Sequence, residues 1–345
     1  MDPELVKLIL LTAFPYAAAQ NVLSETRRRF PTLRLAAPTM PDLSRCDVLA
    51  VEAPPEVEPA ILTGLWSDPD FLSDWLRRPA RLGGVVALLD ARRVPFDLRS
   101  RDRLLDRGWA RTPQDGRSVA DLLVEQIEAA SILALLDPDD QIETTRRQVR
   151  ALNPTARIAL CGAADVGLPR RLLTVEEPAY RETTPPWLRA LRGEPPWPTD
   201  FRGGRCLVYH RRLPFDPERL GRWLERPFPG LLRGKGHLWL LDRWDERIGY
   251  SCAGSFQRTF PAGRWWASAA PGQWPACSNH AADLLAAWHP VLGDREQRLV
   301  LLGDELELDP ARITESLDAC LSDSAADGRL AAASEPPGGR DRTLQ

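Results

Sequence analysis

The chain has 345 residues, with 45 lysine and arginine residues against 48 aspartate and glutamate residues, and therefore a net charge of −3. This length predicts two domains, and a composition of 43% hydrophobic and 27% charged residues excludes a wholly disordered protein. The nearly balanced charge argues against a nucleic-acid-binding surface over the whole molecule, and we expect no sequence-specific nucleic-acid binding. No apolar run approaches the roughly 18–20 residues of a membrane span, and residues 1–4 lack the basic start of a signal peptide. We therefore expect a cytoplasmic protein without a membrane partner.

Short apolar runs of strand length alternate with helical patterns through the first half of the chain. The predicted strands are residues 5–11, 48–51, 85–89, 132–136 and 156–161, and the predicted helices include residues 20–29, 60–66, 118–130 and 143–152. Apolar strands that alternate with helices are typical of a parallel sheet covered by helices on both faces. We therefore predict an α/β domain over residues 1–180.

The character of the chain changes after this domain. Residues 181–203 are rich in proline and polar side chains, and we interpret them as a linker that lies over the surface. Predicted strands at residues 206–210, 237–241 and 299–302, with helices at 216–224 and 309–321, indicate a smaller α+β domain over residues 204–323. Residues 324–345 contain few apolar side chains and are predicted to be a disordered tail.

Five short motifs follow one another along the second half of the chain. They are R-L-P-F-D-P-E-R-L (212–220), L-R-G-K-G-H-L-W-L (232–240), G-D-R (293–295), L-V-L-L-G (299–303) and L-D-A-C-L (317–321). Together they resemble the C-terminal domain of CobW-type proteins. In the first half, V-E-A-P-P (51–55), V-V-A-L-L-D-A (85–91), the helix at 119–130 and L-N-P-T-A-R-I (152–158) are similar to segments of the same family. Members of this family are P-loop GTPases that handle metals, many of them zinc or cobalt chaperones. The resemblance implies a P-loop-NTPase-like domain followed by a CobW C-terminal domain.

The phosphate-binding motif of such GTPases is degenerate in this sequence. A P-loop reads G-x-x-x-x-G-K-[ST], because its glycines open a nest of backbone amides, its lysine supplies charge and its hydroxyl binds Mg²⁺. The corresponding residues 13–20 have Ala13 and Ala18 at the glycines, Pro15 without an amide donor, and Ala19 and Gln20 at the last two positions. A left-handed conformation costs a residue with a Cβ about 1–2 kcal/mol. We predict a pseudo-GTPase with neither nucleotide-binding nor catalytic residues.

Two acidic residues are what remains of the other nucleotide motifs. Glu52 corresponds to the start of the family's E-T-T-G turn, in which Pro55 replaces the glycine, and Asp139 corresponds to the end of its N-K-x-D motif. We interpret Glu52 and Asp139 as vestigial residues left at the surface.

Metal ligands are also sparse. The family's C-x-C-C cluster is missing, and the corresponding interval holds a single cysteine, Cys46. The six cysteines form no C-x-x-C pair, so we expect free, buried thiols. Cys277 and His280 lie one helical turn apart with His289 nearby, a set that could form a zinc site only if the side chains converged. We expect no metal site and no cofactor, with zinc through these three residues as the open alternative, and we expect His237 to be packed.

A basic and aromatic set in the second domain is the candidate partner surface. Its members are Arg211, Arg212, Phe215, Arg233, Lys235, Trp265 and Trp266. Arginine and tryptophan are favoured anchors of protein interfaces. A patch of this kind can meet an acidic protein or phosphate, although a solvated helix face with internal ion pairs is the alternative.

These features suggest three functional hypotheses. The first is a non-hydrolysing accessory or adaptor protein linked to zinc homeostasis, which contacts a protein or the ribosome, because the eroded P-loop is similar to that of actinobacterial ribosome-hibernation recruitment factors. The second is a GTP-dependent zinc or cobalt metallochaperone with an unconventional nucleotide site. The third is an accessory protein of a biosynthetic cluster.

Overall fold

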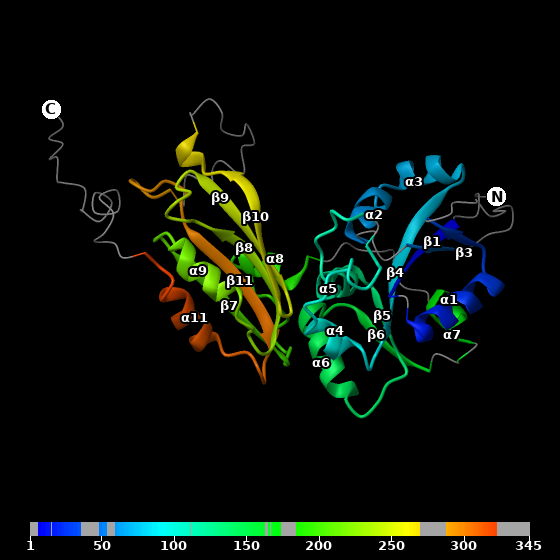
Figure 1. The fold of residues 1–345 in the computed structure, drawn as a ribbon. Coiled ribbons are helices and arrows are strands. Elements are labelled where there is room, and N and C mark those ends of the chain that lie inside the picture. The colour runs from blue at the N-terminus through cyan, green and yellow to red at the C-terminus, as the bar shows by residue number, and fades with distance from the viewer. Residues whose placement is uncertain are drawn as a thin grey trace.

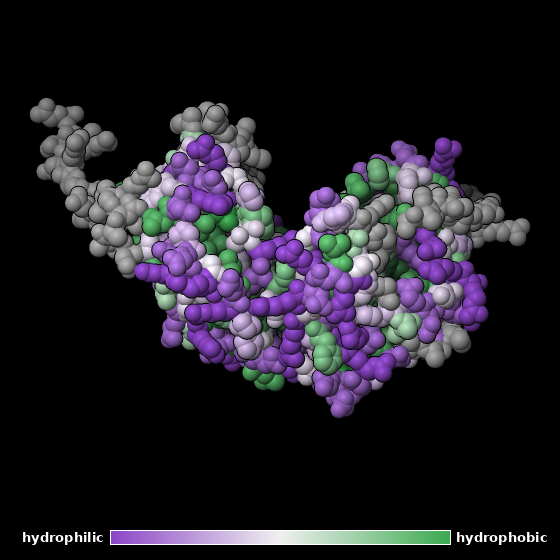
Figure 2. All heavy atoms as spheres, in the orientation of Figure 1, coloured by the Kyte–Doolittle hydropathy of each residue, from purple (hydrophilic) through white to green (hydrophobic). Residues whose placement is uncertain are grey.

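The computed structural model describes residues 6–14, 16–35, 48–53, 59–110, 112–162, 165, 167–173, 184–269 and 288–322. Figure 1 shows two domains side by side, with a helix-flanked sheet from the first half of the chain on the right and a second sheet on the left. The surface that bridges the two domains is mostly hydrophilic on the face drawn in Figure 2. Among the described helices, none is long and apolar enough to cross a membrane.

The first domain is built on a parallel sheet, as the sequence predicted, but the sheet has six strands and not the predicted five, because β2 was missed. Its strands, in spatial order, are β2 (Thr32–Arg34), β3 (Val48–Glu52), β1 (Val6–Ala13), β4 (Ala80–Asp90), β5 (Ile132–Leu136) and β6 (Arg157–Cys161). The strand β1 is therefore central, with β3 and β4 as its neighbours. β4 is longer than the predicted residues 85–89, because Ala80, Leu82 and two glycines extend its pairing with β1.

Helices cover both faces of this sheet because alternate residues of each strand point to opposite sides. Ile9 and Leu11 pack with α1 (Ala17–Arg29) and α7 (Leu168–Leu173). Leu8 and Leu10 pack instead with α2 (Pro59–Trp66) and α3 (Pro69–Leu76). The cluster that contains Leu89 includes residues of α4 (Val94–Leu98), α5 (Val119–Ala129) and α6 (Ile142–Leu152). The result is a three-layer α/β arrangement.

The second domain is a five-stranded antiparallel sheet with helices on both faces. The strand order is β10 (Phe256–Arg264), β9 (Glu246–Ala253), β8 (Leu231–Leu238), β11 (Gln297–Asp304) and β7 (Gly204–Arg211). Leu299 and Leu301 of β11 face a core that includes residues of α9 (Pro217–Leu224) and α11 (Pro310–Asp318), whereas Val300 and Leu302 face α8 (Pro186–Leu191). A short 3₁₀ helix, η1 (Trp266–Ser268), follows β10.

The segment interpreted as a linker does more than connect the domains. From residue 186 it forms α8, and Ala190 is buried against β11. Trp197 stacks on Phe201 and donates its indole N–H to the carbonyl oxygen of Ala151 at the end of α6, over 2.9 Å. Trp197 therefore fixes the second domain to the first. The predicted tail, residues 324–345, lies outside the described residues.

Candidate functional site

The loop after β1 lies at the carboxyl edge of the central strand. In open α/β sheets this edge is where ligands bind, and the next helix directs its free N–H groups there. β1 ends at Ala13 and α1 begins at Ala17. The amide of Gln20 donates to the carbonyl oxygen of Tyr16 over 3.0 Å, which forms the first turn of α1. The residues around this turn decide whether a phosphate could be held.

Three aromatic rings surround the loop. Phe14 is buried, and its ring centroid lies 5.7 Å from that of Tyr16 and 5.2 Å from that of Trp109. The centroids of Tyr16 and Trp109 are 5.6 Å apart in an edge-on arrangement. Such contacts contribute about 0.5–1.5 kcal/mol each beyond the burial of their area. The loop is therefore stabilised by side chains of the protein itself.

A carboxylate faces the same loop. The Tyr16 hydroxyl donates to Oδ2 of Asp97 over 2.9 Å, and the Arg93 guanidinium lies over the Tyr16 ring and 3.5 Å from Oδ1 of Asp97. Burial raises the pKa of Asp97 above its ordinary range, although the bond from Tyr16 and the charge of Arg93 oppose this shift. Burial, together with the charge of Asp97, raises the pKa of Tyr16 to about 12, so its hydroxyl stays a donor at neutral pH.

The residues that we compared with the P-loop glycines and lysine are packed in the core. Ala13, Ala18 and Ala19 are buried in the core between the sheet and α1. Gln20 is half-buried. Pro15 lies outside the described residues. Sequence reasoning missed Asp97, Arg93 and Trp109, because Asp97 lies 81 residues from Tyr16 and no motif joins them.

Glu52 is not a surface residue, which corrects our interpretation. Its side chain is buried and accepts hydrogen bonds from Nε and Nη2 of Arg27 over 2.8 and 2.7 Å, so it ties the end of β3 to α1. A bidentate pair of this kind fixes geometry as well as charge. Asp139, in contrast, is exposed, and its Oδ1 accepts from the amide of Gln141 just before α6.

The proposed metal ligands do not form a described site. Cys277 and His280 lie outside the described residues. Nδ1 of His289 accepts from the amides of Val291 and Leu292, which occupies one of its two ring nitrogens. Within the described ranges no group of three or more histidine, cysteine or acidic side chains could hold a metal ion. His237 packs edge-on against Trp265, and burial lowers its pKa.

Three residues of the predicted partner surface are buried, which corrects that prediction. Phe215, Arg233 and Trp265 have exposed fractions of 0%, 3% and 1%. Phe215 lies in the core of the second domain and Trp265 packs with Trp239. Because they are inaccessible, none of the three can contact a partner directly.

The other members of that set are at least partly accessible but already make contacts within the chain. Arg211 forms a bidentate pair with Asp318 over 2.9 Å for each bond, and Arg212 lies 3.5 Å from Glu296. The Lys235 ammonium lies 5.6 Å from the centre of the Trp187 ring. Trp266 is half-buried and donates its amide to Asp294. The basic set is thus largely an internal network.

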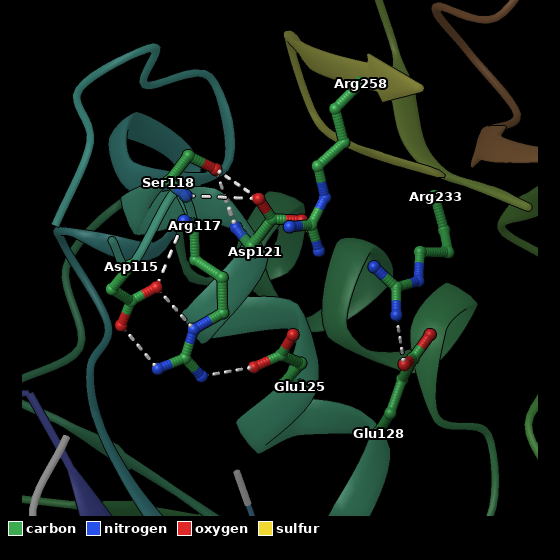
Figure 3. A network of polar contacts seen from close by, with 8 residues as sticks. All are labelled: Asp115, Arg117, Ser118, Asp121, Glu125, Glu128, Arg233 and Arg258. Atoms are coloured by element: carbon green, nitrogen blue, oxygen red, sulfur yellow. Dashed lines mark hydrogen bonds and ion pairs between the residues drawn. The ribbon is translucent and has the colours of Figure 1, made fainter. Parts of the chain in front are cut away.

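Arg233 belongs to a polar network between the domains (Figure 3). Its Nη2 donates to Oε2 of Glu128 on α5 over 2.9 Å, and both side chains are almost fully buried. Asp121 and Ser118 form a capping box at the start of α5. Arg258 of β10 lies within 3.8 Å of the Asp121 carboxylate. Burial raises the pKa of Glu128, and the charges of Arg233 and Lys235 oppose this shift. The acidic face of α5 therefore fixes the second domain.

A pocket of about 300 Å³ lies at the same domain boundary. Leu98 and Gln148 line it from the first domain, and Phe228, Leu232 and Glu307 line it from the second. Arg99 closes one side through a pair with Glu307 over 2.9 Å. Its lining is mostly apolar, and its polar side chains are those of Arg99, Gln148, Ser255 and Glu307.

Comparison with known proteins identifies the second domain. Residues 205–321 match the family described as the cobalamin synthesis protein cobW C-terminal domain. The second domain is a CobW C-terminal domain. This match covers the five-stranded sheet, α9 and α11. The domain before it has a three-layer α/β fold built on a parallel sheet.

Relatives support the same assignment over more of the chain. The chain is 27% identical over 288 residues to the zinc-regulated GTPase metalloprotein activator 1 of Dictyostelium discoideum, a match that covers 80% of the chain and 60% of that protein. It is 32% identical over 212 residues to a zinc chaperone of Mycobacterium tuberculosis, which covers 60% of the chain and 50% of that protein. The chain thus spans little more than half the length of these relatives.

A solved structure, the Zn(II)-bound YjiA GTPase from E. coli, aligns with 93% of the chain and all of its own length. The sequence identity is 14% and the TM-score is 0.34. At this TM-score the similarity carries no argument about the site.

Proposed function

We propose that this CobW-type chain is an accessory protein of zinc homeostasis that acts by binding other proteins, and that it neither binds nor hydrolyses GTP. The hydrogen bond from Tyr16 to the buried Asp97 carries the proposal. It puts a carboxylate beside the loop where a P-loop GTPase needs amides and a lysine. A negative charge beside this loop disfavours a triphosphate, although the neighbouring Arg93 guanidinium offsets part of that charge.

The rest of the loop supports the same function. Phe14, Tyr16 and Trp109 pack on one another, and burying them favours the loop in its ligand-free form. Ala18 and Ala19 fill core positions and offer no charge to a phosphate. Arg93, whose guanidinium lies over the Tyr16 ring, is already paired with Asp97. A triphosphate would have to displace these contacts before it could bind.

The link to zinc rests on the relatives. One is named a zinc-regulated GTPase metalloprotein activator and another a zinc chaperone. The described residues of this chain contain no three-ligand cluster of their own, so we place its role in contacts with partners and not in carrying the ion. The ribosome is the partner that the resemblance to hibernation factors implies.

A turnover assay tests the non-hydrolysing role. We expect phosphate release from Mg²⁺·GTP at the rate of the buffer, with or without zinc. Asp97→Asn is the variant to compare with the wild-type chain, because asparagine removes the negative charge of Asp97 and keeps the shape of its side chain. Zinc-stimulated release by the wild-type protein would favour the alternative suggested by the relatives' names, a GTP-dependent zinc or cobalt metallochaperone with an unconventional nucleotide site.

The ribosomal partner has its own test. We expect the full chain to co-sediment with ribosomes from zinc-depleted cells at low salt, where electrostatic contacts are least screened. Its absence from the ribosomal fraction under these conditions would remove the ribosome from the proposal and leave a protein partner.

A further inference from the structure

Two short helices of the first domain expose large apolar side chains at helical spacing. Ile61 and Leu65 of α2 are 58% and 50% exposed, and Phe71 and Trp75 of α3 are 46% and 36% exposed. Each pair is separated by four residues, so its members lie one above the other on the same side of their helix. Figure 2 shows hydrophobic surface over these helices. We refer to these four residues as the α2–α3 face.

The two helices that carry the α2–α3 face are packed against the sheet on their other side. Trp66, Leu72 and Leu76 on the other sides of the two helices are buried against the sheet. The Trp75 ring stacks on Trp66 with centroids 5.7 Å apart. The exposed side chains are therefore presented by ordered helices. Clustered apolar side chains on such a surface mark interaction sites in soluble proteins.

The charges of α3 are arranged in order along the helix. Asp68 and Asp70 lie just before and at the start of the helix, Asp74 lies in its last turn, and Arg77 and Arg78 follow its end. Within the described ranges, Asp70, Asp74 and Arg77 make no ion pair, although all three are exposed. If two copies of α3 run antiparallel, the acidic part of each helix meets the basic end of the other. The α2–α3 face of one copy is therefore complementary in charge to the same face of a second copy.

Arg77 has an unusual backbone conformation for an arginine. It caps the end of α3 with φ 54° and ψ 33°, in the left-handed region. Glycine is preferred at such a cap, and a residue with a Cβ costs about 1–2 kcal/mol there. Strain at an exposed position indicates a use for the side chain. A charge that reaches a second molecule would be such a use.

We propose that two copies of this chain form a symmetric dimer through the α2–α3 face. In this dimer α3 packs antiparallel to its counterpart, so that Phe71 contacts Trp75 of the partner subunit and Asp70 pairs with Arg77 of the partner subunit. Two-fold pairing through the same patch on both copies is the commonest way in which soluble proteins assemble. The proposal is independent of whether the chain binds nucleotide.

Sedimentation velocity over a concentration series tests the dimer. We expect the wild-type chain to show a monomer–dimer equilibrium that Phe71→Asp and Asp70→Arg each weaken by about tenfold or more. Arg77→Gly should weaken it as well while the fold becomes more stable, because glycine relieves the left-handed cap. Leu306→Asp is the control, since Leu306 is 72% exposed but lies in the second domain; this variant should dimerise like the wild type.

A charge exchange makes the test specific. The chain that carries both Asp70→Arg and Arg77→Asp should recover the dimer, because each new charge again meets its opposite. Circular dichroism of every variant checks that it is folded. A wild-type chain that stays monomeric at all concentrations, or a dimer that responds equally to Phe71→Asp and Leu306→Asp, would overturn the proposal. A monomer that instead binds an added partner protein through this face would overturn it too.

Discussion

Tyr16 and Asp97 are 81 residues apart in the chain and are joined by a hydrogen bond of 2.9 Å from the tyrosine hydroxyl to the carboxylate. The bond lies at the end of the central strand, where Phe14 and Trp109 enclose it. It connects the loop after β1 to α4. The loop after β1 is therefore held to the first domain by its own side chains.

Removing this bond should destabilise the first domain. Tyr16→Phe loses one hydrogen bond and leaves the buried Asp97 without it, so we expect a loss of about 1–3 kcal/mol. Asp97→Asn should cost less, because an amide oxygen can still accept from the hydroxyl. Urea unfolding at pH 7 measures both. A double variant, Tyr16→Phe with Asp97→Ala, should cost less than the sum of its two single variants, because each single change removes the same hydrogen bond. Strict additivity would contradict the assigned contact.

The Arg233–Glu128 pair should contribute strongly to the attachment of the second domain. Both side chains are nearly fully buried, and removing one partner of a buried pair costs about 3–5 kcal/mol. We expect this loss for Arg233→Ala in denaturant unfolding. Arg99→Ala is the matched control, because Arg99 also pairs with a glutamate across the domains but is 57% exposed, and such pairs contribute about 0–1 kcal/mol. Equal losses for the two variants would contradict the role of burial.

Gly254 allows the close approach of the two domains. It turns the chain between β9 and β10 with φ 52°, and a Cβ there would collide with the carbonyl oxygen of Leu98 in the first domain. Gly254→Ala should therefore loosen the interface, seen as faster hydrogen exchange in α4 and β9. Gly263→Ala is its control, because Gly263 has φ 98° but open space where an alanine methyl group would lie. Exchange that rises equally in both variants would show that backbone strain alone is responsible.

Glu296 should make the second domain sensitive to acid. It lies 2.9 Å from Nε2 of His210 and 3.6 Å from Nε2 of His237. Burial opposes the shift, but the hydrogen bond with His210 and the nearby His237 lower the pKa of Glu296 from 4.5 to about 2. Because the folded state holds the proton less tightly, its contribution is complete above pH 4.5 and is lost as the pH falls toward 2.

The measurement is urea unfolding between these pH values, with Glu296→Gln as the comparison. The wild-type chain should lose more stability on acidification than the variant does. Since Glu296 is partly accessible to solvent, we expect a modest difference. Parallel curves would show that other carboxylates dominate the acid response.

The sequence predicted the first sheet well because its strands are continuous apolar runs. β5 occupies the predicted residues, Ile132–Leu136, where five apolar residues stand between Ser131 and Asp137. Strands β9 and β10 were missed, since their polar and glycine residues interrupt any apolar run. Their inward side chains, such as Tyr250, are recognised only once β8 is beside them.

The site could be predicted only in part. The sequence predicts that the loop after β1 departs from a P-loop. It does not predict the contacts of that loop, because Asp97 and Trp109 reach it through the tertiary fold. The same limit explains the error at Arg233. An arginine in a basic segment resembles a surface residue until its partner, Glu128, is found on another domain.

Calorimetric titration of the full chain with Mg²⁺·GTP tests most directly whether the loop after β1 has lost nucleotide binding. We expect only the heat of dilution, which corresponds to a Kd weaker than about 1 mM. A saturable heat with a Kd near about 1 μM, abolished by a bulky substitution at Ala18, would contradict the proposal and show that the loop still holds a triphosphate.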